Sequence, residues 1–171
     1  MMLLHIETAR LQICPFTEEM ADSVCHNSLD RDNREFLPDE VFETPAEALE
    51  TIRFLQGCYD REGPQVYPVL LHDGTQIGHV QAVHLNTGDW EIGYHIGADY
   101  TGKGYAAEAV RGFLPVILPR LGIRKIWGIC RADNLASQKV LERCGFRMQY
   151  KGPGQHHGAT REICRYLYEL K

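Results

Sequence analysis

The sequence predicts one mixed α/β (α+β) domain over residues 1–171, and not a doubly wound fold. A chain of 171 residues can bury one core well and is too short for two ordinary domains. Strand patterns come in direct succession in the middle of the chain, with helical patterns before and after them. That order is typical of a mixed, partly antiparallel sheet, whereas a doubly wound sheet needs strictly alternating strands and helices.

The first part of the chain predicts one strand and two helices. The strand covers residues 11–16, and Thr17 can cap a helix that runs to about residue 29. Thr44-Pro45-Ala46-Glu47 is a capping box with proline at the first helical position, so a second helix starts there. Gly57 or Gly63 is expected to end it.

The middle of the chain predicts an antiparallel meander. Its strands are residues 66–71, 76–85 and 90–96. Asp73-Gly74 is typical of a tight hairpin turn, and residues 86–89 form a second connection rich in turn residues.

The last part predicts alternating elements that end in two strands. A helix over residues 104–118 is expected to kink at Pro115, and a strand follows over residues 125–130. The next helix covers 134–143 and closes at Cys144-Gly145. The final strands, 149–152 and 164–170, are separated by a Gly- and His-rich stretch, 152–160, that we expect to be a mobile loop.

Composition narrows the classes of partner and compartment. The net charge of -5 argues against a nucleic-acid partner, and the longest apolar stretch is far too short to span a membrane. The six cysteines form no CxxC pair, and the first residues do not match a signal peptide. We therefore expect a cytoplasmic protein with reduced thiols and no metal, and a homodimer stays open as its assembly state.

The most informative segment is a glycine-rich turn between a strand and a helix. It reads Gly97-Ala98-Asp99-Tyr100-Thr101-Gly102-Lys103-Gly104-Tyr105. Glycines let backbone N–H groups point inward, the helix start adds partial positive charge, and Lys103 adds a full one. Such a turn predicts a site for a phosphate or pyrophosphate.

Three other interpretations fit parts of this segment. Residues 97–103 satisfy the P-loop spacing GxxxxGK, but Gly104 stands where the magnesium-binding Ser or Thr belongs. Gly102, Gly104 and Ala107 fit a dinucleotide fingerprint, but that motif belongs to an alternating fold, and here a meander precedes it. A glycine-rich turn without any ligand is the third interpretation.

The surrounding residues favour one family. Asp89-Trp90-Glu91-Ile92-Gly93-Tyr94-His95-Ile96, followed by residues 100–109, resembles the strand, pyrophosphate loop and helix of the GNAT superfamily of N-acetyltransferases. Asn134-Leu135-Ala136-Ser137 and residues 140–146 are similar to that family's second signature. Residues 7–11 and 166–168 are similar to the branch that acetylates the N-termini of ribosomal proteins.

This resemblance implies a fold, a co-substrate and a set of ligands. The implied sheet is mostly antiparallel, flanked by helices and splayed between its fourth and fifth strands, with the pantetheine arm of acetyl-CoA between them. The acceptor would be a primary amine, on a small molecule or a protein N-terminus. One departure is Asp99, where the family often has Gln or Arg. The implied acetyl-CoA contacts are Ile96, Gly97, Gly102, Lys103, Gly104, Tyr105, Ala106, Asn134 and Ser137.

Attack on a thioester requires a neutral amine, and Glu91 is the leading candidate for the base. Deprotonating a lysine-like amine at pH 7 costs about 4.6 kcal/mol, against about 1 kcal/mol for an α-amine. Side chains alternate along a strand, so Glu91, Gly93 and His95 share one face. The alternative is that Glu91 forms an ordinary ion pair.

Ser137 is the candidate partner of the leaving thiolate. Many relatives carry a tyrosine acid where this chain has Leu141, and the resemblance to the ribosomal-protein branch implies that Ser137 takes its place. Asn134 is in any case a good N-cap for the helix.

Two further features are candidates for the acceptor side. Residues 31–42 resemble the variable acceptor-side loop, whose Asp32, Glu35, Asp39 and Glu40 either attract a cationic substrate or form a solvated charge run. His156-His157 is a candidate for the acceptor entrance. The rival functions are a CoA-binding regulatory module without catalysis and a nucleotide-binding P-loop protein.

Overall fold

The computed structural model describes residues 3–171, and its core is a single eight-stranded sheet. The strand order is β1-β2-β3-β4-β5-β6-β8-β7. β5 and β6 run parallel, and the other neighbouring strands are antiparallel. The strands are β1 (Ile6–Glu7), β2 (Leu11–Ile13), β3 (Gln65–Leu71), β4 (Gln76–His84), β5 (Trp90–Ile96), β6 (Lys125–Arg131), β7 (Arg147–His156) and β8 (Ala159–Glu169).

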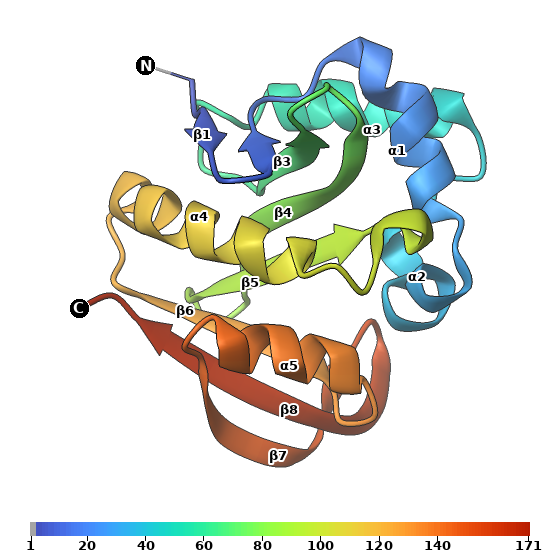
Figure 1. Ribbon diagram of the computed structural model, residues 1–171. Coiled ribbons are helices and arrows are strands. Elements are labelled where there is room, and N and C mark those ends of the chain that lie inside the picture. Colours follow the sequence, from blue (N-terminus) through green and yellow to red (C-terminus); the bar gives the residue numbers. More distant parts are fainter. Residues whose placement is uncertain (1–2) are drawn as a thin grey trace.

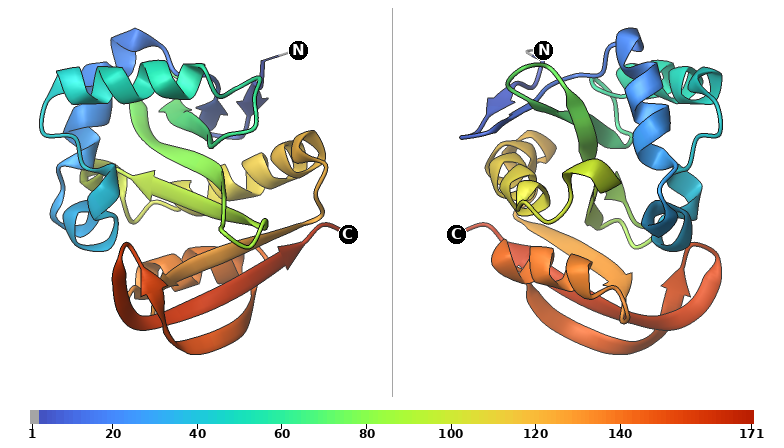
Figure 2. Two further views of the ribbon diagram at one scale, coloured as in Figure 1. Left: turned by 180° about the vertical axis from the view of Figure 1, so that it is seen from behind. Right: turned by 45° about the vertical axis from the view of Figure 1, so that its right-hand side comes forward.

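Helices cover both faces of this sheet. α4 and α5 lie in front of it in Figure 1, and α3 lies behind it; the view from behind in Figure 2 shows α3 in front. α1 packs against α3 and β4. The helices are η1 (Glu18–Met20), α1 (Ala21–Ser28), α2 (Arg31–Phe36), η2 (Pro38–Glu40), α3 (Pro45–Gln56), η3 (Ala98–Tyr100), α4 (Tyr105–Leu121) and α5 (Leu135–Arg143).

The core lies between the sheet and α4. Val110, Phe113, Leu114 and Ile117 recur at helical spacing on α4 and are 1% exposed or less. Tyr67 of β3 packs its ring against Phe113, with 5.9 Å between the centroids. This packing fixes the first turn of α4, and with it the glycine loop, against the middle of the sheet.

Most of the predicted elements are confirmed. The three meander strands begin and end within one residue of their predicted bounds. Thr44 Oγ1 accepts the Glu47 N–H at 3.2 Å, so the predicted helix start is correct. The second half of the capping box is wrong, because Glu47 accepts from Glu43 N and not from Thr44 N.

In the N-terminal region the structure differs from the prediction in two details. Thr17 makes no capping hydrogen bond, and α1 begins only after the short turn η1. β1 and α2 were not predicted, because elements of two and six residues are too short to show a hydrophobic period.

The predicted mobile loop at residues 152–160 is wrong, because most of it is strand. β7 and β8 pair from Arg147 down to His156, which lies opposite Ala159, and only His157 and Gly158 form the turn. Gly154 fits inside this ladder because the Ile163 side chain occupies the space that a Cβ at residue 154 would need.

The predicted splay between the fourth and fifth strands is confirmed. Those strands are β5 and β6, and one residue pair, Glu91 with Trp127, joins them. Beyond that pair the two strands separate toward Ile96 and Arg131. The backbone of β5 therefore loses its β6 partner where a cleft opens.

Candidate active site

The predicted pyrophosphate loop leads directly into α4. Gly102 and Gly104 have φ of 77° and 82°, in the left-handed region that glycine adopts without steric cost. Gly104 is the N-cap of α4, and no side chain caps this end. The first-turn N–H groups of a 17-residue helix are therefore without a side-chain acceptor, which fits an anionic group as their partner.

An ion-pair brace holds this loop to the N-terminal strands. Arg10 donates to the carbonyl oxygen of Lys103 at 2.9 Å and to Glu108 Oε1 at 2.7 Å. Its guanidinium also lies over the Tyr105 ring, 4.4 Å from the centroid. Sequence reasoning missed this brace, because Arg10 and Glu108 are 98 residues apart and nothing local links them.

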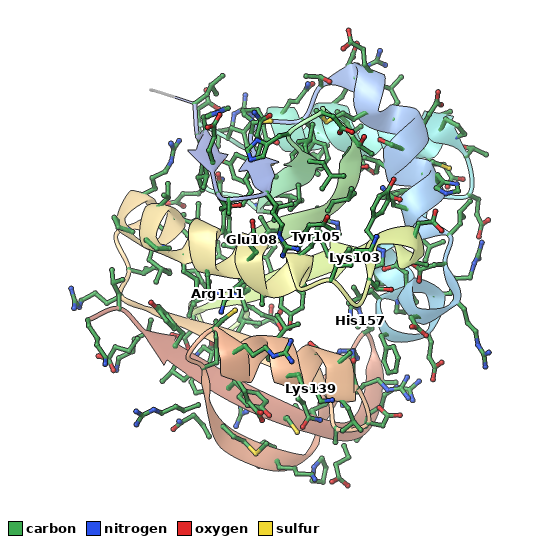
Figure 3. All side chains as sticks on the ribbon, in the orientation of Figure 1. Lys103, Tyr105, Glu108, Arg111, Lys139 and His157 are labelled. Atoms are coloured by element: carbon green, nitrogen blue, oxygen red, sulfur yellow. The ribbon has the colours of Figure 1, made fainter. Side chains whose placement is uncertain are left out.

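Three basic side chains lie on the glycine loop and on the helices α4 and α5. Figure 3 shows Lys103 at the loop before α4, Arg111 along α4 and Lys139 on α5, the helix next to it. Positive charge on both helices fits a co-substrate that carries several phosphates.

A cavity of about 450 Å³ occupies the space where β5 and β6 separate. β5 contributes residues 92–96 to its wall, β6 contributes 128–130, and α2 contributes Asp32, Asn33 and Phe36. The predicted residues Ile96, Ala106, Asn134 and Ser137 all line this cavity.

Gly97 begins the turn after β5, and its contact with acetyl-CoA stays a prediction. Its N–H donates to Ile77 O at 2.8 Å, and its carbonyl accepts from Tyr100 N at 2.9 Å. Both backbone groups are therefore bonded within the protein, so Gly97 shapes the turn after β5. Glycine is required there because a Cβ would clash with the side chain of Asn27.

Ser137 lies at the start of α5, where Asn134 positions it. Asn134 Oδ1 accepts from Ser137 N at 3.2 Å, as expected of an N-cap. Ser137 Oγ is 2.8 Å from the hydroxyl of Tyr94, which also lies 3.1 Å from the Ser137 carbonyl oxygen. Burial raises the pKa of Tyr94, so its hydroxyl stays protonated at neutral pH.

Tyr94, the hydrogen-bond partner of Ser137, is a candidate active-site residue that the sequence interpretation missed. The alternation along β5 places Tyr94 on the face opposite Glu91, toward α5, and that signal was available in the sequence. Cys130 on β6 also lies beside Ser137, and burial raises the pKa of its thiol to about 12. The thiol is therefore neutral and a weak nucleophile.

Glu91 belongs to the single residue pair that joins β5 and β6. Its side chain is half-buried, and burial together with the nearby carboxylate of Glu40 raises its pKa to about 7. A carboxyl group with this pKa can accept a proton near neutral pH far better than an ordinary glutamate. Glu91 is adjacent to Ile92 and Gly93, which line the cavity, but is not itself part of the lining.

The two segments predicted for the acceptor side meet at one end of the cleft. His157 Nδ1 lies 2.7 Å from Asp39 Oδ2, which joins the β7–β8 turn to η2. Arg131 of β6 lies 3.6 Å from Glu35 and stacks over the Phe36 ring of α2. The structure thus brings together the two segments, residues 31–42 and 156–157, that the sequence marked for the acceptor side.

Residues 3–171 contain neither a membrane-spanning helix nor a metal-binding cluster. None of the helices there has the length and apolar character to cross a bilayer. No group of three or more His, Cys, Asp or Glu side chains in that range is placed to hold a metal ion.

A parallel strand pair that splays over a cleft, next to a glycine-rich helix start, is the arrangement expected of an acetyl-CoA-dependent N-acetyltransferase. The sequence comparison agrees, since the family described as Acetyltransferase (GNAT) domain matches residues 10–147. The chain therefore belongs to the GNAT family of acetyltransferases.

Individual relatives are distant in sequence and close in fold. An uncharacterized N-acetyltransferase of Bacillus subtilis, YnaD, is 27% identical over 85% of this chain and 84% of its own. A GNAT-family acetyltransferase from Bacillus anthracis has a TM-score of 0.82 at 23% identity, with 97% and 98% of the two chains covered. The ribosomal-protein alpha-N-acetyltransferase RimL, solved with coenzyme A, has a TM-score of 0.82 at 17% identity over 98% of each chain.

Proposed function

We propose that this enzyme transfers the acetyl group of acetyl-CoA directly to a primary amine, with Glu91 as the base and Ser137 as the hydrogen-bond donor to the departing thiolate. The observation that supports it best is the position of Glu91. It lies at the apex of the cleft, on the opposite face of β5 from Tyr94, the hydrogen-bond partner of Ser137. An amine held between the two faces would have the base on one side and the thiolate donor on the other.

Binding of the co-substrate is assigned to the loop and the cleft. The N–H groups of Gly102, Lys103, Gly104, Tyr105 and Ala106 would bind the pyrophosphate at the start of α4. The pantetheine arm would lie along β5, where the strand has no β6 partner, with Ile96 and Asn134 beside it. Acetyl-CoA supplies the thioester; the protein supplies position, a base and a hydrogen-bond donor.

Glu91 would take the proton that the acceptor must lose. Its pKa of about 7 is close to that of an α-amine, so transfer of the proton from such an amine is nearly balanced. Glu91 acts directly or through one water molecule, since both routes fit a half-buried carboxylate beside the cavity.

Ser137 would act late in the reaction. The Tyr94 hydroxyl has a single hydrogen, which the Ser137 carbonyl oxygen or Ser137 Oγ can accept. With that hydrogen on Oγ, the serine hydrogen would point into the cleft toward the thiolate. A donor aimed at charge that develops only in the transition state raises turnover more than it raises affinity.

The acceptor is proposed to be a protein N-terminal α-amine or a small polyamine-like molecule. Asp30, Asp32 and the other acidic groups on the acceptor side favour a cation. The structure of RimL, a ribosomal L7/L12 alpha-N-protein acetyltransferase, supports the first option by fold alone.

A free-thiol assay with a panel of amines tests the proposal. The panel holds a peptide with a free N-terminus, its N-blocked counterpart with one lysine, and a polyamine. Acceptor-dependent release of CoA, with a product heavier by one acetyl group in the mass spectrum, is the expected result. If no amine raises thiol release above the hydrolysis seen with acetyl-CoA alone, transfer to a primary amine is wrong.

A further inference from the structure

Four polar side chains share one face of the β4–β5 strand pair. His79 lies opposite His95 in the ladder, and Gln81 lies opposite Gly93. Because side chains alternate along a strand, Glu91 is on the same face as Gly93 and His95. This is the face that α1, α2 and η2 cover, and it is the acceptor side of the cleft.

Glu40 of η2 is held against this face by two contacts. Its Oε1 accepts from Gln81 Nε2 at 3.2 Å, and its Oε2 lies 3.3 Å from His79 Nε2. Neither Glu40 Oε2 nor His79 Nε2, both fully buried atoms, has a hydrogen bond of good geometry. The Gln81 side chain itself lies over Gly93, where a Cβ would be 2.7 Å from its Nε2. Glu40 therefore sits above the strand pair, next to Glu91.

We propose that Glu40 is a positioning residue for acetyl transfer, a second half-buried carboxylate held on the Glu91 face of the strand pair by Gln81 and His79, and that it acts on the acceptor only through Glu91. The inference rests on the proposed role of Glu91 as the base. Glu40 acts at a distance from the acceptor, because it is not part of the cavity lining and its Oε2 is closed to solvent.

The surroundings of Glu40 and Glu91 shift the pKa values of the two carboxyl groups in opposite directions. Burial raises the pKa of Glu40, but His79, His95 and the hydrogen bond from Gln81 outweigh it, so this pKa stays below its ordinary value. Glu91 has burial and the charge of Glu40 acting in the same direction, and its pKa rises to about 7. Glu40 therefore keeps its charge, and Glu91 is the member of the pair that takes up a proton.

Other titratable groups face this pair from each neighbouring element. His79 comes from β4 and His95 from β5, and Asp30, just before α2, lies 3.2 Å from His95 Nε2. Cys130 of β6, a neutral thiol, lies beside Ser137. Of these groups, Glu40 is the one whose charge raises the pKa of Glu91.

A direct titration of Glu91 tests the inference without any need for activity. Protein labelled with ¹³C at glutamate carboxyl carbons is titrated by NMR, and Glu91→Gln identifies the Glu91 signal by its loss. In Glu40→Gln the Glu91 midpoint should fall from about 7 by about one pH unit, yet stay above 4.5 because burial remains. Glu40→Asp, which keeps the charge, should restore most of the shift.

Glu43→Gln is the matched control. It removes one negative charge from the same part of the chain, but Glu43 is exposed and paired with Arg34. It should leave the Glu91 midpoint unchanged. An unmoved Glu91 midpoint in Glu40→Gln, with thermal stability and acetyl-CoA affinity intact, would overturn the inference. Glu40→Met, also neutral and of similar length, repeats the test should Glu40→Gln not fold.

The pH profile of kcat/KM then measures the consequence for the reaction. Because Glu91 must be ionised to act, the acid limb in Glu40→Gln should move to lower pH by the same amount as the NMR midpoint. If Glu91→Gln is as active as the wild type, the proposed base is wrong, whatever the titration shows. If Glu91→Gln is inactive and the limb of Glu40→Gln does not move, the role of Glu40 alone is wrong.

Discussion

Glu91 is a residue whose proposed task conflicts with the stability of the fold. A carboxyl group ionises more easily in water than in a half-buried site, so the folded chain holds the Glu91 proton more tightly than the unfolded chain. The pKa is about 7 in the folded chain against 4.5 for an ordinary glutamate. The tighter binding of the Glu91 proton stabilises the folded chain. This stabilisation is complete below pH 4.5 and is lost as the pH rises through 7, where the buried charge of Glu91 opposes folding.

Glu91→Gln should therefore stabilise the enzyme at high pH. At pH 8 the free energy of unfolding should rise by about 1–3 kcal/mol, because a neutral amide replaces a desolvated charge. At pH 5 the gain should shrink, since Glu91 is then already protonated. Urea denaturation at the two pH values measures the difference, and an equal change at both would show that the ionisation of Glu91 is not the cause.

The same substitution should reduce turnover. At neutral pH the rate should fall by about 10²–10⁴, the usual contribution of a positioned base. Raising the pH should recover part of the loss, beginning near the pKa of the acceptor, at about 8 for an α-amine and about 10 for a lysine-like amine. Turnover equal to that of the wild type at every pH would make Glu91 a structural residue.

Ser137→Ala should reduce turnover far more than it weakens acetyl-CoA binding. The thiolate charge exists only late in the reaction, so loss of its donor should cost about 10²-fold in kcat. Tyr94→Phe should have a smaller effect, and none once Ser137 is already alanine, because Tyr94 acts through it. Ser23→Ala, a helix serine bonded to Met20 O and away from the cleft, is the control. An unchanged kcat under conditions where chemistry limits the rate would remove Ser137 from the mechanism.

At the scale of single elements, the glycine loop and α4 allow the clearest test of the proposed pyrophosphate site. Both ends of α4 have a glycine in the left-handed region, Gly104 at the N-cap and Gly122 at the C-cap. A side chain at either position strains the backbone by about 1–2 kcal/mol, but only Gly104 is placed at the proposed pyrophosphate site. A comparison of substitutions at Gly104 and Gly122 therefore separates a loss of folding stability from a loss of acetyl-CoA affinity.

Gly104→Val should weaken acetyl-CoA binding by about tenfold or more, with Gly122→Val as the control. Both variants should lose similar thermal stability, and calorimetric titration with acetyl-CoA should find an altered Kd in Gly104→Val alone. An affinity within about a factor of two of the wild type, under roughly 0.5 kcal/mol, would show that the loop does not bind the pyrophosphate.

Elements with a clear period or a local motif could be predicted from the sequence, and elements defined by partners far along the chain could not. The meander strands, the Thr44 helix start and the glycine loop each depend on a few adjacent residues. The second half of β7 contains Gly152 and Gly154 and shows no strand pattern of its own, so only its pairing with β8 defines it. The same limit applies to the site: Tyr94 and Ser137 are 43 residues apart, and only the fold brings them to hydrogen-bond distance.

At the scale of the whole molecule, the cleft separates two parts that touch at both of its ends. At the apex they meet in the single strand pair of Glu91 and Trp127. At the open end, side chains of β6 and of the β7–β8 turn contact α2 and η2, and Figure 2 shows the turn close to α2 in the view from the right. This arrangement leaves the interior of the cleft to a ligand while fixing its width.

The single pair between β5 and β6 also has a consequence for isotope exchange. Amide groups of residues 92–96 that point toward β6 have no strand to bond to, so in the free enzyme their hydrogens should exchange with deuterium quickly for a central strand. Bound coenzyme A should slow that exchange, whereas the amides that bond β5 to β4 should be slow in both states. Mass spectrometry of overlapping β5 peptides would read this contrast. Equal protection on the two edges of β5 in the free enzyme would mean that the strands close up when no ligand holds them apart.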